Sequence, residues 1–238
     1  MNPIPVIRRR VPLIAILALA ALLLDALVVF AANRPANAGD PPTAPAIVHD
    51  HGELPAPIGD EQVAFHDQMR KLWEDHVTWT RLAIVTFADG SAGFDATATR
   101  LLQNQVDIGD AIKPFYGDAA GAQLTSLLHD HITIAVEILQ AAKAGDTNAF
   151  NDANARWYAN ANDIADFLAT ANPRFWPQSV MREAMKTHLD QTLAEAAHEL
   201  GGDYTASVSD YEAAHLHILA MADLLSSGII LQFPSKFH

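Results

Sequence analysis

The chain repeats one pattern three times: two helical stretches joined by a short turn, with a histidine in the apolar stripe of the first stretch. Residues 104–110 resemble residues 160–166, 56 positions further on. The histidines keep nearly the same step, since His76 and His131 are 55 residues apart and His131 and His188 are 57 apart. Such a repeat brings one polar residue of each hairpin to a comparable place, so it predicts a polar layer inside a helical bundle.

Six helices are expected, because apolar residues recur at three- and four-residue steps along six stretches of the chain. They should cover about residues 60–88, 95–116, 119–144, 147–171, 178–200 and 204–231. Turn residues separate them, as at Gly145-Asp146, where a glycine stop precedes an N-cap candidate. No segment alternates with the two-residue period of a half-buried strand. The sequence therefore predicts an all-α fold, a six-helix bundle built from three repeated hairpins at residues 60–234, followed by a tail at residues 235–238.

The N-terminal segment is expected to determine the compartment. Three arginines at residues 8–10 precede an apolar run over residues 11–32 that contains a single charge, Asp25. Twenty-two residues are long enough to span a bilayer, and the arginines should stay on the cytoplasmic side. Residues 1–33 are thus a signal anchor or a signal peptide, the latter with cleavage after Ala38. The bundle is expected outside the cytoplasm, joined to this segment by a proline-rich linker at residues 34–59.

Composition excludes several classes of function. The chain has no cysteine, so disulfides, thiolate metal sites and cysteine nucleophiles are absent. Residues 39–238 hold 11 basic and 27 acidic residues, a formal charge of −16. Such a surface repels nucleic acid, which is therefore not an expected partner. The expected partners are the membrane, which residues 11–32 contact, and an unidentified protein.

Six polar side chains are expected at one level of the bundle. Each lies about 13–15 residues from the turn of its hairpin, or roughly 20 Å along the helix. The first helices contribute His76, His131 and His188, and the second helices contribute Asn104, Asn160 and His217. Three hairpins closed around a common axis would bring these residues together, whereas a flat array would not. The sequence leaves both arrangements open, although so apolar a domain favours a compact bundle.

This layer is the candidate site. Imidazoles converging in an apolar shell suit zinc, copper or iron, and the candidate metal ligands are His76, His131, His188 and His217. A histidine ligand needs a partner for its second ring nitrogen. The candidates for that role, or for contacting a small polar ligand directly, are Asn104, Asn160, Asp107 and Asp163. The alternative is a purely structural network in which these buried polar groups satisfy one another.

Two short motifs could also carry chemistry. Glu195-Ala-Ala-His198 and Glu212-Ala-Ala-His215 have the Glu-x-x-His spacing of di-iron bundles, which also require glutamates from two other helices. The motif arises easily by chance, so ordinary surface charges are the favoured interpretation. Arg81 would be costly to bury alone and is expected to pair with an acidic residue, Glu137 being one option.

The sequence Leu72-Trp73-Glu74-Asp75-His76-Val77-Thr78-Trp79-Thr80-Arg81 resembles a family of uncharacterised bacterial all-helical proteins. The similarity continues through Asn104-Gln105-Val106-Asp107-Ile108, Trp157-Tyr158-Ala159-Asn160 and Gln232-Phe233-Pro234, and covers about residues 65–234. The family has no established activity. The resemblance therefore implies the bundle and its histidine and asparagine positions as a unit, and it transfers no catalytic residues.

Taken together, these patterns predict an extracytoplasmic bundle that binds a transition metal or a small polar ligand at its interior layer. A cell-envelope scaffold or interaction module with a structural polar network is the alternative. A metal-dependent oxidoreductase or hydrolase is a third hypothesis. An enzyme of this sequence would depend on a metal, because the sequence has no serine–histidine arrangement for nucleophilic catalysis and no glycine-rich phosphate loop.

Overall fold

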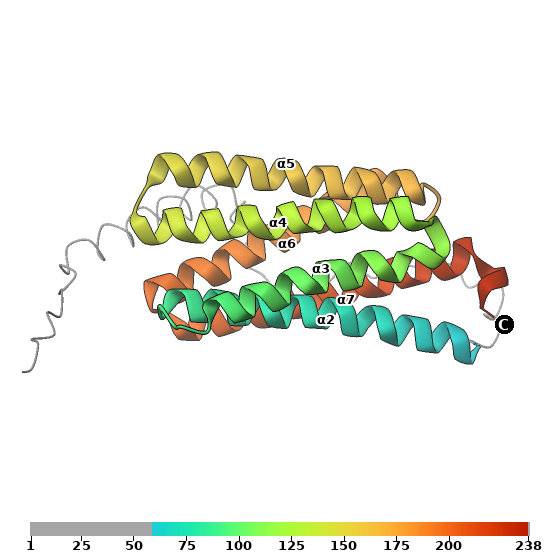
Figure 1. Cartoon of the computed structure of the whole chain (residues 1–238), viewed down its shortest axis with the longest axis horizontal. Coiled ribbons are helices and arrows are strands. Elements are labelled where there is room, and N and C mark those ends of the chain that lie inside the picture. The colour runs from blue at the N-terminus through green and yellow to red at the C-terminus, as the bar shows by residue number, and fades with distance from the viewer. Residues whose placement is uncertain (1–58, 238) are drawn as a thin grey trace, which may run out of the picture. The chain divides into compact units, whose positions relative to one another are not determined.

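The computed structural model describes residues 59–237, and these residues form an all-α bundle (Figure 1). Its helices are α2 (Asp60–Ala88), α3 (Phe94–Tyr116), α4 (Asp118–Ala144), α5 (Thr147–Ala171), α6 (Gln178–Gly201) and α7 (Tyr204–Gln232). A short 3-10 helix, η1 (Pro234–Lys236), follows. The predicted helix bounds are correct to within one residue, and the prediction of an all-α bundle is confirmed.

The six helices close into a ring. Each packs against its neighbours in the chain, and α7 packs against α2, which completes the circle. Helices α2, α4 and α6 are the first members of the hairpins α2–α3, α4–α5 and α6–α7. Because α2 also contacts α4 and α6 across the ring, residues on these helices can meet near the axis. The flat arrangement that the sequence left open is thus excluded.

Two of the hairpin turns use the same cap. Gly145 ends α4 and Gly202 ends α6, both in the left-handed conformation that glycine tolerates best, with φ of 70° and 80°. The next residue is an aspartate in each case. Asp146 accepts a hydrogen bond from the Ala149 amide, and Asp203 caps α7 in the same way. A glycine stop followed by an aspartate start gives the sharp reversal that each hairpin needs.

Close helix contacts depend on glycine at two places. At the crossing of α3 and α4, a Cβ added to Gly109 would lie 2.7 Å from the Gly121 carbonyl oxygen. At Gly228 of α7, a Cβ would lie 2.1 Å from Nε1 of Trp176, which is buried in the loop between α5 and α6. The Trp176 ring thus occupies the space that a larger residue at 228 would need.

The main core runs through all six helices, and aromatic rings cover it at the end near the C-terminal residues. Phe237 stacks on Phe115 with ring centroids 5.5 Å apart, and Phe65 lies 5.0 Å from Phe115. The bundle therefore extends past residue 234 into the expected tail. Among the described residues, every buried residue of the core lies between Phe65 and Ile229. Residues 58–238 make up one of the two compact units of the chain, and this unit has a hydrophobic core of its own.

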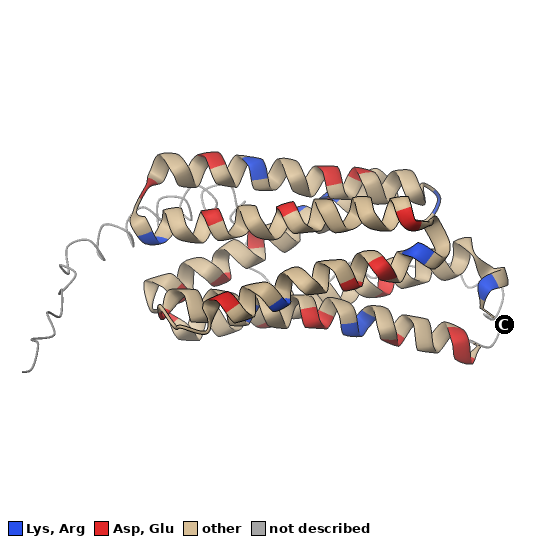
Figure 2. Cartoon of the chain, in the orientation of Figure 1, with Lys and Arg blue, Asp and Glu red and all other residues tan. Residues whose placement is uncertain are grey.

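Charged residues are scattered along the helices (Figure 2). Many form ion pairs between neighbouring helices, such as Arg70 with Asp223 and Arg182 with Asp166. Among the described residues, only α7 is long and apolar enough to cross a membrane, and 44% of its apolar window is buried in the bundle. The predicted membrane segment at residues 11–32 and the linker lie outside the described residues, apart from Gly59.

Candidate functional site

Three of the predicted histidines line one cavity. His76 of α2, His131 of α4 and His188 of α6 face a cavity of about 50 Å³ in the middle of the bundle. The ring centroids of His76 and His188 are 5.7 Å apart, and those of His131 and His188 are 6.2 Å apart. His188 thus lies between the other two, and the three hairpins contribute one imidazole each.

His131 has the best-defined surroundings. The Asn160 side-chain amide donates to the Leu127 carbonyl, so its oxygen is the atom that faces His131. His131 Nδ1 lies 2.8 Å from that oxygen and must be the protonated nitrogen, which leaves Nε2 with a free lone pair. Trp157 stacks on the imidazole and donates its indole N–H to the His131 carbonyl. The ring is therefore fixed in both orientation and tautomer.

The other two imidazoles are held less completely. The Gln105 side-chain amide lies 3.3 Å from His76 Nδ1, and the same amide donates to the Asn104 side chain at 3.2 Å. Among the described residues, His188 Nδ1 and His131 Nε2 are buried and lack a hydrogen-bond partner. Buried polar atoms are normally paired, and these two ring nitrogens are among eight buried side-chain atoms of the described residues that lack a hydrogen-bond partner. They differ from the other six in belonging to residues that line the cavity.

All three imidazoles are neutral in the fold. Burial lowers the pKa of His76 to about 3 and that of His131 to about 4. Burial also lowers the pKa of His188 well below its ordinary value, and the neighbouring His76 and His131 lower it further. A layer of neutral imidazoles offers nitrogen lone pairs rather than positive charge.

The second helix of each hairpin makes the same hydrogen bond. A side chain there donates to the main-chain carbonyl four residues before the histidine of the first helix. The three bonds are 2.9, 3.0 and 2.9 Å long and join Asn104 to Leu72, Asn160 to Leu127 and His217 to Ala184. These side chains therefore fasten the two helices of each hairpin together at one level.

The remaining predicted site residues lie away from the cavity. His217 does not line it, since its Nε2 donates to the Ala184 carbonyl between α7 and α6. Asp107 of α3 pairs with Arg100 and accepts a hydrogen bond from Gln103. Asp163 is exposed on α5 and lines a shallow surface groove. The structure thus brings together three of the four predicted metal ligands and neither aspartate.

The arrangement does not form a ready metal centre. Within residues 59–237, no group of three or more histidine, aspartate or glutamate side chains is disposed to hold a metal ion. The two Glu-x-x-His motifs are also used otherwise. His198 pairs with Asp210 at 2.6 Å, His215 lies 3.4 Å from Glu74, and Glu195 belongs to a separate cluster.

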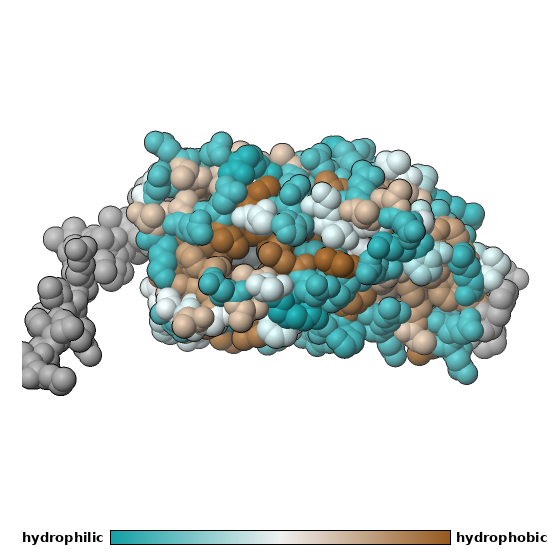
Figure 3. Space-filling model, viewed as in Figure 1, coloured by the Kyte–Doolittle hydropathy of each residue, from teal (hydrophilic) through white to brown (hydrophobic). Residues whose placement is uncertain are grey.

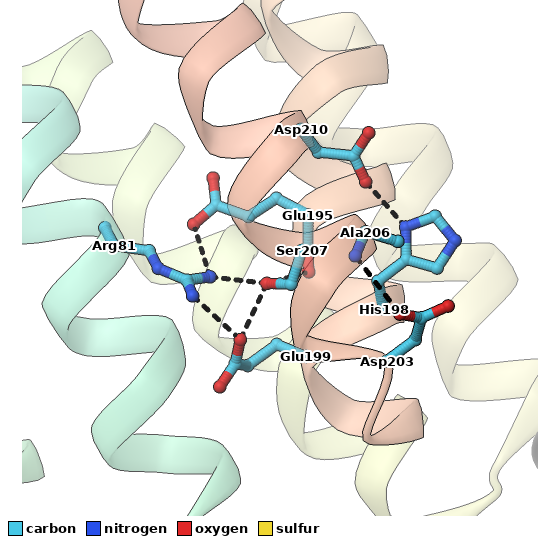
Figure 4. A network of polar contacts seen from close by, with 8 residues as sticks. All are labelled: Arg81, Glu195, His198, Glu199, Asp203, Ala206, Ser207 and Asp210. Atoms are coloured by element: carbon cyan, nitrogen blue, oxygen red, sulfur yellow. Dashed lines mark hydrogen bonds and ion pairs between the residues drawn. The ribbon is translucent and has the colours of Figure 1, made fainter.

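That cluster surrounds Arg81 (Figure 4). The guanidinium lies 3.3 Å from a Glu195 oxygen, 3.0 Å from a Glu199 oxygen and 2.5 Å from the Ser207 hydroxyl, which itself donates to Glu199. Burial raises the pKa of Glu195 to about 7, although the nearby Arg81 opposes this shift. One arginine thus serves two buried carboxylates, and the raised pKa of Glu195 allows a proton to balance the remaining charge below about pH 7.

The prediction of Glu137 as a partner for Arg81 is wrong. Glu137 is exposed on α4 and pairs with Arg156 of α5. The sequence carried a signal for the correct partners, because Glu195 and Glu199 fall on the stripe of α6 that also carries His188. Carboxylates on a buried stripe require a buried cation.

Comparison of the chain with protein-family models, with curated proteins and with solved structures gave no match.

Proposed function

We propose that the bundle binds a small ligand in the cavity between the three histidines. The observation that carries this proposal is the pair of buried, unpaired nitrogens, His131 Nε2 and His188 Nδ1, in a layer that lines a cavity. Leaving a buried polar atom unpaired costs about 1–3 kcal/mol. A ligand that occupies the cavity and pairs with these atoms recovers that free energy as binding energy.

The cavity has room for more than one water molecule. A single buried water needs roughly 10–15 Å³ of such volume, and the cavity has about 50 Å³. A purely structural network would also pair its own atoms, as the Asn104 and Asn160 amides do with main-chain carbonyls. The histidine layer has unpaired ring nitrogens and borders a cavity, and this combination favours a ligand-binding role.

A transition metal such as zinc, copper or iron is the second candidate ligand. It is favoured by the Asn160 oxygen, which holds His131 Nδ1 as metal-ligating histidines are usually held and leaves Nε2 bare. The described residues do not form a group of three ready donors, so metal binding would require the imidazoles to reorient. The small-molecule form of the proposal requires no such movement.

The test uses residues 59–238 with ¹⁵N-labelled histidine. Zn²⁺, Cu²⁺ and a set of molecules of up to six heavy atoms are added in turn while the ring nitrogens are observed by NMR. We expect at least one probe to shift the His131 and His188 signals in saturable fashion. The exposed His129, two residues away on the same helix, supplies the control: the effect should survive His129→Ala and disappear in His131→Ala. The proposal fails if no probe shifts these signals and native mass spectrometry finds no copurified ligand.

We also propose that the bundle works outside the cytoplasm, tethered by residues 11–32 or released after Ala38. The support is the arginine-flanked apolar run and the proline-rich linker. Protease added to spheroplasts of cells that produce the full chain should digest the bundle, unless the bundle has already been released during spheroplast preparation or into the medium. Protection of the bundle in the spheroplasts, with degradation only after lysis, would contradict this placement.

An interaction module is the alternative function, and the outer face of α7 favours it. Tyr204, Val208, Leu216 and Leu231 are all at least half exposed there, with Leu216 at 68%. Exposed apolar side chains along one helix can pair with the same side chains of a second copy. Sedimentation should then show a dimer that Leu216→Glu dissociates and that Val63→Glu, on the exposed side of α2, leaves intact. A monomer at every concentration would exclude this self-association.

A further inference from the structure

We infer that the cavity accepts a neutral, slim molecule that presents one hydroxyl group to the imidazoles and leaves a short apolar chain toward the α3–α4 side. The inference rests on the proposed function and names the class of ligand. It follows from the polar atoms that the cavity offers, the charges that it lacks, and its size and opening.

Among the imidazole nitrogens of the lining, His131 Nε2 is the one whose role a hydrogen bond elsewhere on the ring fixes. His131 is protonated on Nδ1 by its bond to Asn160, so its Nε2 can only accept. The two threonines of the lining have already used their hydrogens, because the hydroxyls of Thr80 and Thr192 donate to the carbonyls of His76 and His188. A ligand that pairs with His131 Nε2 must therefore bring a hydrogen-bond donor.

No charged side chain lines the cavity among the described residues. A carboxylate or an ammonium group would enter without a counter-ion, at a large desolvation cost. Burial also keeps the histidines neutral, so they do not readily supply a positive charge to an anion. A neutral hydroxyl avoids both penalties and supplies the donor that His131 Nε2 lacks.

The rest of the lining is apolar and partly open. It includes Ile84, Leu101, Ile132, Val136, Leu139 and Ala196. Figure 3 shows a hollow between α3 and α4 with an apolar rim. The cavity lining includes residues of both helices, Leu101 of α3 and Ile132 of α4 among them. A cavity that binds benzene has about 150 Å³. At about 50 Å³ the closed part holds the hydroxyl and the first carbons of an unbranched chain, and further carbons extend toward the opening.

The experiment compares three probes of equal chain length, 1-butanol, butyrate and butylammonium, on ¹⁵N-histidine-labelled residues 59–238 at pH 7. We expect 1-butanol to shift His131 Nε2 in saturable fashion and to raise the melting temperature, and the two ions to do neither at the same concentration. From ethanol to 1-butanol, affinity should rise about fourfold per added methylene. The exposed-site variant His129→Ala should behave like the wild type.

A second variant separates binding from folding. Ala135 lines the cavity and forms no part of the histidine contacts, so Ala135→Phe should fill the cavity and abolish the response to 1-butanol while the domain remains folded by circular dichroism. Butyrate or butylammonium binding as tightly as 1-butanol, or an unchanged response in Ala135→Phe, would overturn the inference. A histidine response to Zn²⁺ with none to 1-butanol would also overturn it while leaving the proposed function standing. No response to any probe, metal ions included, would remove both.

Discussion

Acidification from pH 6 to pH 5 is expected to destabilise the bundle, because three buried histidines are neutral in the fold. The pKa of His131 falls to about 4 and that of His76 to about 3, and His188 shifts in the same direction. In the unfolded chain each imidazole titrates near 6.5. The unfolded state therefore binds more protons below pH 6.5, so stability is complete above this pH and is lost as the pH falls.

The magnitude follows from proton counting. One proton of difference is worth about 1.36 kcal/mol per pH unit, and each unfolded histidine takes up most of one proton in this range, so the three lose about 3.5 kcal/mol together. Glu195 acts in the opposite direction, since its pKa is about 7 in the fold against 4.5 for a free side chain. Its stabilising effect is present at low pH and is lost as the pH rises toward 7. It offsets about 1 kcal/mol, which leaves a net loss of about 2.5 kcal/mol.

Urea unfolding of residues 59–238 at pH 6 and pH 5, followed by far-UV circular dichroism, measures this difference. The dependence of unfolding free energy on urea should be the same at both pH values, so that the midpoints report stability alone. His131→Gln should remove about 1.2 kcal/mol of the pH-dependent loss, which is about half of the net value. The matched variant His129→Gln should not change it. An unfolding free energy that is unchanged or higher at pH 5 would refute the assignment of neutral, buried imidazoles.

Three further changes have defined outcomes. Gly228→Ala should destabilise the fold by about 1–3 kcal/mol in urea unfolding, because the new Cβ overlaps the Trp176 ring, and a gain in stability would contradict this packing. Arg81→Met should cost about 3 kcal/mol at pH 8, where two buried carboxylates lose their cation, and less at pH 5, where Glu195 carries a proton; equal losses at both pH values would contradict the charge balance. His217→Asn should keep the hydrogen bond to α6 and stay near wild-type stability, whereas His217→Leu should lose about 1 kcal/mol.

The helices were predictable because local signals agreed. The apolar stripes indicated which face of each helix is buried. Gly145-Asp146 marked one turn, because a glycine C-cap and an aspartate N-cap depend only on residues a few positions away. The closure of the ring was not predictable, since it depends on α7 packing against α2, more than a hundred residues away. The repeat placed the histidines at one level but did not show that α2, α4 and α6 face one another.

The site was predicted in part for the same reason. The equal spacing of His76, His131 and His188 carried real information about their common level, and closure of the ring then brought them around one cavity. His217 shares the level but belongs to a second helix, and its imidazole fastens α7 to α6 as Asn104 and Asn160 fasten their own hairpins. The spacing along the sequence fixes the level of a residue along the bundle axis. Whether its side chain faces the cavity depends on how the helices pack in three dimensions.

The first and second helices of the hairpins differ in how the protein uses their polar side chains. On the second helices, Asn104, Asn160 and His217 make hydrogen bonds to main-chain carbonyls of the first helices, so helix pairing alone accounts for them. The histidines of the first helices are not accounted for in this way. His131 would hold Asn160 through Nδ1 alone, yet its Nε2 stays buried and unpaired, as does Nδ1 of His188. An apolar side chain of similar shape would avoid that penalty at position 188. Imidazoles beside an apolar cavity are therefore costly for stability alone, and a ligand that pairs with their free nitrogens gives them a reason to be there.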